Sequence, residues 1–152
     1  MLLVLFSLCF ARDIELNGIN RLVSTDPPTP VGPQAALQPE ILHSLEGKVL
    51  ERRVRVIVGE QTVVLHPQEA EALGFMVARC GESELSGPLK STACVATLET
   101  IGGNKVTVRR TSENVSITAY DLPLYATSAV ALGAGELAAL LDMVASRAAE
   151  AG

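Results

Sequence analysis

The sequence predicts an α+β protein, a two-layer sandwich in which a mainly antiparallel sheet carries two helices on one face. Two observations predict this class. Short runs rich in valine and threonine alternate with polar residues and are separated by turn residues, which is typical of antiparallel strands. Two segments rich in alanine and leucine follow such strands directly and have helical periodicity. We therefore expect two strand–helix units that share a sheet, preceded by an extended N-terminal arm.

The segments 63–78 and 130–145 resemble each other at an offset of 67 residues. The matched residues are Val63 with Val130, Glu69 with Glu136, Ala72 with Ala139, Leu73 with Leu140, and Met76-Val77-Ala78 with Met143-Val144-Ala145. We interpret the match as an internal repeat, a pseudo-duplicated strand–helix unit. The competing explanation is that two helices rich in Ala, Leu and Glu resemble each other because good helix formers are few. One unit buries too little apolar surface to be stable, so two should close over a common core.

Residues 1–38 are predicted to be an apolar tip followed by a proline-rich arm or linker. Residues 12–38 are interpreted as a connector, because four prolines from Pro27 to Pro33 remove backbone donors and favour extended coil. The alternative is an ordered arm that lies across a neighbouring subunit. Residues 1–11 have three interpretations: a buried strand or membrane-adhering tip, a start codon placed too early, or a truncated secretion signal. This segment is too short to span a bilayer, which takes roughly 20 apolar residues.

Residues 39–152 are predicted to form a single α+β domain. In its first half we expect a short helix over 39–49, strands over 54–58 and 62–65, and a helix over 67–79. A loop over 82–90 should follow. In the second half we expect strands over 92–100, 105–110, 115–120 and 125–132, and a closing helix over 135–150. Glycine-containing or polar turns separate most of these strands.

Composition limits the class of partner. Hydrophobic residues make up 48 % of the chain, but aromatic residues only 3 %, and tryptophan is absent. The core must therefore be aliphatic, and large aromatic binding anchors are scarce. A formal net charge of −5 argues against broad electrostatic capture of DNA or RNA.

The three cysteines are Cys9, Cys80 and Cys94. Their odd number and irregular spacing argue against a disulfide framework or a zinc site. The simplest interpretation is a cytoplasmic protein with small apolar thiols in or near the core. A Cys80–Cys94 bridge is the alternative, if the protein is exported.

No catalytic, cofactor-binding or metal-binding residue is predicted. His66 precedes Pro67 at the expected start of a helix, and its counterpart in the repeat is Gly133, so the repeat does not require an imidazole. The two histidines lack the spacing of a metal site. Cys80 lies near a helix C-terminus, where the dipole disfavours a reactive thiolate. No nucleophile elbow, phosphate loop or dinucleotide fingerprint is present, so we expect a protein that is not an enzyme.

One surface is a candidate for binding an anionic partner. If the valines of two strands face the helices, the alternating residues face away from them. This candidate set is Arg53, Arg55, Lys105, Arg109 and Tyr120. Such a basic sheet face could contact phosphates or an acidic protein, although a solvated polar face has the same composition.

The function predicted from these observations is that of a small accessory or interaction protein. It would act through self-association, as a homodimer or other homo-oligomer, and through binding a protein partner. A strand that ends in Leu-x-Pro-x-Glu-Ala-x-x-Leu, from Leu65 to Leu73, beside alanine-rich helices resembles in style small proteins of GC-rich bacteria and their phages. This resemblance carries over no functional residue. A nucleic-acid-associated regulator is the first alternative, and an exported protein with a Cys80–Cys94 disulfide is the second.

Overall fold

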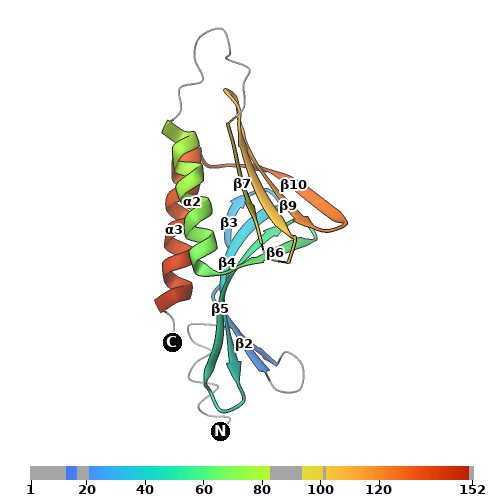
Figure 1. The fold of residues 1–152 in the computed structure, drawn as a ribbon, viewed down its shortest axis with the longest axis vertical. Helices are drawn as coiled ribbons and strands as arrows, with labels where there is room; N and C mark the ends of the chain where they lie inside the picture. The colour runs from blue at the N-terminus through green and yellow to red at the C-terminus, as the bar shows by residue number, and fades with distance from the viewer. Residues whose placement is uncertain (1–12, 17–20, 83–93, 101, 151–152) are drawn as a thin grey trace.

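The computed structural model describes residues 13–16, 21–82, 94–100 and 102–150 (Figure 1). Within this part of the chain the strands form two antiparallel sheets. The first sheet contains β1 (Asp13–Leu16), β2 (Arg21–Thr25), β3 (Thr29–Gly32), β4 (Ala35–Ser44), β5 (Val49–Val58) and β6 (Gln61–Leu65). The second sheet contains β7 (Cys94–Glu99), β8 (Lys105–Arg110), β9 (Val115–Asp121) and β10 (Leu124–Val130). The helices are α2 (Pro67–Glu82) and α3 (Ala134–Glu150).

The two helices lie side by side in one layer, and both sheets lie on the same side of that layer (Figure 1). The α+β class with antiparallel strands and two helices on one face is therefore confirmed. The strands divide into two sheets, however, where the sequence predicted a shared one. α2 packs mainly on β7 of the second sheet, and α3 packs on β4 and β5 of the first. Each helix thus covers the sheet that the other half of the chain contributes.

The two halves have the same order of elements, four antiparallel strands followed by a helix: β3 to α2 and β7 to α3. The helices also begin in the same way. The Glu69 carboxylate accepts a hydrogen bond from the His66 N–H at 2.9 Å, and the Glu136 carboxylate accepts one from the Gly133 N–H at 3.4 Å. Both pairs satisfy a backbone donor at the helix start and place a negative charge at the positive end of the dipole. Segments 63–78 and 130–145 therefore share their local geometry, as predicted; their origin by duplication stays a prediction.

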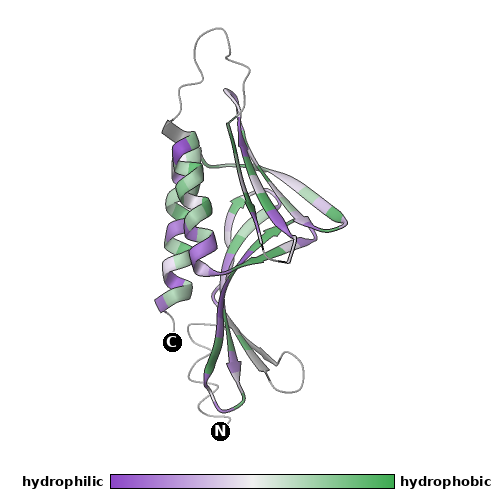
Figure 2. Cartoon of the chain, viewed as in Figure 1, coloured by the Kyte–Doolittle hydropathy of each residue, from purple (hydrophilic) through white to green (hydrophobic). Residues whose placement is uncertain are grey.

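A single aliphatic core fills the space between the sheets and the helices. Its large members with essentially no exposed surface include Val31, Leu37, Val54, Val56, Val58, Val63, Leu65, Leu73, Ile117, Leu137 and Leu141. The predicted alternation along β5 is confirmed, since every second residue from Val54 to Val58 is buried. Hydrophobic and hydrophilic residues accordingly alternate along the strands and around both helices in Figure 2.

The helices approach closely at Gly74 of α2. A Cβ at this position would lie 3.2 Å from the Ala138 carbonyl oxygen and 3.3 Å from the Leu141 Cβ. Leu141 is the counterpart of Gly74 at the repeat offset of 67 residues, so equivalent positions meet where the helices pack. A glycine inside a helix costs about 1 kcal/mol relative to alanine. The close helix contact supplies the reason for accepting that cost.

The two sheets are joined at one edge, where β3 meets β10. The Ala131 N–H donates to the Val31 carbonyl at 2.9 Å, and the Gln34 N–H donates to the Ser128 Oγ at 3.3 Å. Gly32 lies at this junction, and a Cβ there would overlap the Ala129 carbonyl oxygen. The missing side chain lets the two backbones approach.

The prediction of a connector over residues 12–38 is wrong for the described part of that segment. β2 and β3 both pair with β4, and Val31 is 1 % exposed within the core. The prolines are tolerated because Pro27 and Pro28 lie between strands and Pro30 lies in a strand at the sheet edge. The predicted tip over residues 1–11 lies outside the described residues, as does nearly all of the predicted loop over 82–90.

The short helix predicted over 39–49 is also wrong, because β4 covers residues 35–44 and crosses the predicted boundary at residue 38. Pro39 lies where β4 changes neighbour from β3 to β2. Its carbonyl accepts a hydrogen bond from the Asp26 N–H at 3.3 Å on that side. In an extended strand the backbone nitrogen and carbonyl of one residue point to the same side. The N–H that Pro39 lacks would therefore point to the edge where β4 changes from β3 to β2, and no regular strand pair loses a hydrogen bond there.

Replacing Gly74 by leucine should lower the free energy of unfolding by about 2–3 kcal/mol, because the new side chain must push α3 away. Urea denaturation measures the change. Gly135, in the first turn of α3, has no atom within 4 Å of an added Cβ. Gly135→Leu is the matched control and should leave stability unchanged or slightly raised. Equal destabilisation by both variants would contradict the importance of the helix contact.

Candidate functional site

The predicted basic residues do not gather on one sheet. Arg53 and Arg55 belong to β5 of the first sheet, whereas Lys105 and Arg109 belong to β8 and Tyr120 to β9 of the second. In each strand the predicted alternation is present, because the intervening valines are buried. The five side chains therefore lie on the outer faces of two different sheets.

Arg53 has a structural partner. Its guanidinium lies 2.9 Å from the Glu40 carboxylate, the residue opposite it on β4, and its Nε donates to the same oxygen at 3.0 Å. The Glu40 side chain is only 5 % exposed, so its charge requires a compensating cation. This ion pair stabilises the first sheet and leaves less of the guanidinium available for a ligand.

The outer face of the second sheet carries a central row of four threonines, one from each strand. Strand register places Thr97, Thr107, Thr118 and Thr127 side by side. The hydroxyls of Thr97 and Thr107 lie 3.1 Å apart, and those of Thr118 and Thr127 lie 2.8 Å apart. Cross-strand pairs of this kind stabilise a sheet by roughly 0.2–1 kcal/mol each. We call this surface the threonine face.

Two further rows border the threonines. One consists of Glu99, Lys105, Tyr120 and Tyr125, and the other of Val95, Arg109, Ser116 and Ala129. The Lys105 ammonium lies 4.6 Å from the centre of the Tyr120 ring, and the Tyr120 and Tyr125 rings are 5.7 Å apart. The Lys105 ammonium and the two tyrosine rings thus form a continuous contact across three strands. The structure keeps Lys105, Arg109 and Tyr120 of the predicted set on this one face.

The turn between β9 and β10 is unusually apolar. Leu122 is 62 % exposed, Leu124 61 % and Tyr125 68 %. The equivalent turn of the first half is polar, Gly59-Glu60, and is anchored by a hydrogen bond of 2.7 Å from the Gly59 N–H to the Gln34 carbonyl. The predicted strands over 115–120 and 125–132 left residues 121–124 only as the connection between them. The signal that could have revealed the surface was Leu122-Pro123-Leu124-Tyr125, four residues without a charge at a turn.

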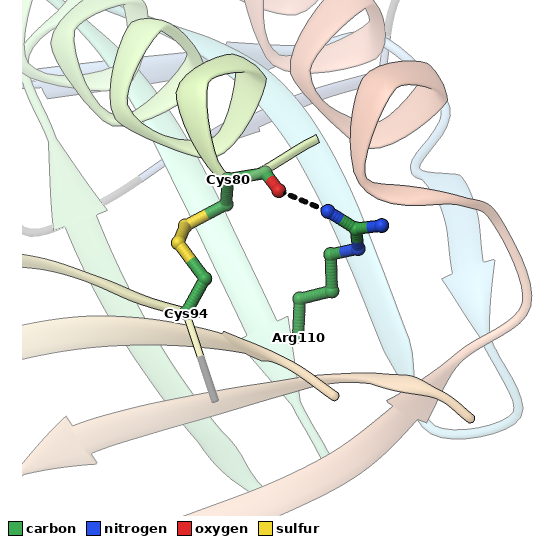
Figure 3. Close-up of a disulfide and its surroundings, with 3 residues drawn as sticks. All are labelled: Cys80, Cys94 and Arg110. Carbon is green, nitrogen blue, oxygen red and sulfur yellow. Dashed lines mark hydrogen bonds between the residues drawn. A yellow bond between two sulfur atoms is a disulfide. The ribbon is translucent and has the colours of Figure 1, made fainter. Parts of the chain in front are cut away.

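The expectation of two free thiols at Cys80 and Cys94 is wrong, since their sulfurs are bonded at 2.04 Å. The bond joins the last turns of α2 to the start of β7, and Arg110 donates a hydrogen bond to the Cys80 carbonyl beside it (Figure 3). The two cysteines are 14 residues apart. Closing a loop of this length stabilises a fold by about 3 kcal/mol in the chain-entropy model. Spacing could not predict the pairing, because it does not show that a helix end and a strand start meet.

His66 lies at the start of α2. The His66 carbonyl accepts the first helical hydrogen bond, from the Ala70 N–H at 3.0 Å, and its side chain lies 4.0 Å from the Glu51 carboxylate. In the described part of the chain no group of three His, Cys, Asp or Glu residues is placed to hold a metal ion. Nor is any described helix both long and apolar enough to cross a lipid bilayer.

One hollow of about 470 Å³ lies where the start of β5 meets the beginning of α2 and the end of α3. Its lining includes Leu50, Arg52, Glu71, Ser146 and Ala149. The Arg52 guanidinium is already engaged, since it donates to the Ala148 carbonyl at 3.3 Å.

No family model, curated protein or solved structure matches this chain. The features of this chain that bear on function are therefore the threonine face, the apolar β9–β10 turn and the disulfide. Of these, the threonine face and the turn are continuous, because Tyr125 belongs to both.

Replacing Arg53 by alanine should lower the free energy of unfolding by about 3 kcal/mol, because Glu40 would remain buried without its cation. Urea denaturation of Arg53→Ala measures this loss. The control is Arg55→Ala on the same strand and face, which should change stability by no more than about 0.5 kcal/mol. Similar values for the two variants would show that the ion pair has no structural role.

Proposed function

We propose that this protein is a non-enzymatic interaction protein, and that the threonine face together with the β9–β10 turn binds a protein partner. The observation that carries the proposal is the exposure of Leu122, Leu124 and Tyr125 at one corner of that face. Tyrosine at the centre of a desolvated patch is among the residues that dominate binding energy. The chain has only five aromatic residues, two Tyr and three Phe, and both tyrosines lie together on this face.

The rest of the face suits a broad protein contact. The threonine pairs satisfy part of their own hydrogen-bonding capacity, so covering them costs less than covering isolated hydroxyls. Four paired strands also hold the side chains in fixed positions, which reduces the entropy lost on binding. Lys105 and Arg109 at the borders would favour a partner with an acidic rim.

Binding of single-stranded nucleic acid is the alternative function. It is favoured by the Lys105–Tyr120–Tyr125 contact, because exposed rings stack on bases while cations contact phosphates. Two facts make nucleic-acid binding the less favoured function. Glu99 lies beside Lys105 in the same row, and the whole chain has a net charge of −5. Both oppose the accumulation of a polyanion.

The proposal includes self-association and an accessory role in a bacterial or phage assembly. For location, the cytoplasm is the first expectation and export is the alternative. The Cys80–Cys94 bridge supports export, because disulfides persist in oxidising compartments and are rare in the cytosol.

A photo-crosslinking amino acid at position 125, introduced in the cells that make the protein, should yield a specific adduct with another protein. The same group at Leu45, which is 48 % exposed in the β4–β5 turn, is the matched control and should yield no such adduct. A nuclease-sensitive adduct at position 125 would support the nucleic-acid alternative instead. Equal adducts at both positions would remove the proposed site.

Intact-mass analysis after thiol blocking tests the location. If the protein is exported, Cys80 and Cys94 should resist alkylation until a reductant is added. If it is cytoplasmic and reduced, both should alkylate at once in a chain that retains Met1, and export would then be abandoned.

A further inference from the structure

We propose that the outer edge of β7 pairs with β7 of a second copy of this chain. The two strands would run antiparallel about a two-fold axis at Thr97. The four strands of each copy would then form one continuous eight-stranded sheet. This inference rests on the self-association included in the proposed function, and it names the surface responsible.

The outer edge of β7 has no partner strand among the described residues. Among the strands that the structure describes, β7 pairs only with β8, so no described strand engages the backbone donors and acceptors of its other edge. At the opposite end of the same sheet, the β10 edge is joined to β3 by the Ala131 N–H to Val31 carbonyl bond. The β6 edge strand of the first sheet packs against β9. The remaining edge strand, β1, has only four residues, two of them acidic, whereas β7 has six residues with one charge. β7 is thus the longer and less charged of the two edges that could accept another strand.

The sequence of β7 does not block such pairing. Residues Cys94 to Glu99 contain no proline, glycine or lysine and only one charge. β3, which takes the same place in the other half, contains Pro30 and follows Pro27-Pro28. Proline and charge are the usual devices that keep an edge strand from pairing with another molecule. The first half has prolines at its edge strand β3, and the second half has none in β7.

A two-fold axis at Thr97 gives complementary contacts on the outer face. Thr97 lies opposite Thr97 of the second copy, which extends the threonine row across both sheets. Glu99 lies opposite Val95 of the second copy, and Val95 is the neighbour of Arg109 within its own sheet. The backbones of Glu99 and Arg109 of the second copy are then two strands apart, roughly 10 Å, a gap that their long side chains can bridge. Because of the two-fold axis, the Glu99–Arg109 ion pair would form twice, once from each copy.

The same axis brings the two α2 helices together, because α2 packs on β7. At 100° per residue, Ala72 and Met76 both lie about 160° around the helix from Gly74, which contacts α3. They therefore lie on the flank of α2 that faces away from α3. Ala72 is exposed and Met76 is half-buried. Their contact with the second copy would add apolar burial to the strand pairing.

The experiment uses cysteine cross-linking in a Cys9→Ser background, so that Cys80 and Cys94 remain bonded to each other. Under mild oxidation Thr97→Cys should form a covalent dimer on a non-reducing gel, because the two substituted residues face each other. Thr127→Cys is the matched control. It lies in the same row at the opposite edge of the sheet and should remain monomeric.

Light scattering with dilution provides the second measurement. Glu99→Arg should raise the dimer dissociation constant about tenfold or more, and the double variant Glu99→Arg with Arg109→Glu should restore most of the affinity. A wild-type chain that stays monomeric at high concentration would overturn both self-association and this inference. If the wild-type chain dimerises but Glu99→Arg leaves the dissociation constant unchanged, or Thr97→Cys forms no covalent dimer, only the β7 arrangement would be overturned.

Discussion

The contact between α2 and α3 is the constraint on which the architecture depends. Each helix packs on the sheet of the other half, so neither half has a complete core until the helices lie side by side. The contact is possible because Gly74 lets the Ala138 carbonyl and Leu141 approach. Both helices begin with the same carboxylate-to-backbone bond, at Glu69 and at Glu136, so the two strand–helix transitions enter this layer in equivalent geometry.

The halves differ at the places that are available to partners. The first half carries additional strands at its edge, an anchored polar turn, and prolines near the edge strand. The second half has an edge at β7 that no described strand covers, an apolar turn after β9, and an ordered threonine face between them. A fold built from two similar units can in this way use one unit mainly for stability and leave the other for binding.

Residues of one chemical type also acquire different roles from their surroundings. Arg53 neutralises a buried carboxylate, whereas Lys105 lies over an aromatic ring on an open sheet face. The sequence places both in alternating strands and does not distinguish them. The distinction arises from Glu40, whose burial depends on how β4 packs with its neighbours on both edges.

The sequence alone determined the α+β class, the strands and helices from residue 54 onward, the equivalent strand–helix transitions, and the alternation that buries Val54, Val56 and Val58. These features are local, because periodicity and helix-start chemistry act over a few residues. Only the tertiary structure decided that residues 21–25, 29–32 and 35–44 form strands, that Cys80 meets Cys94, and that the predicted basic set divides between two sheets. Each of these depends on which distant segments become neighbours. A proline at a sheet edge and a proline in a linker have the same local signature, and only the partner strand distinguishes them.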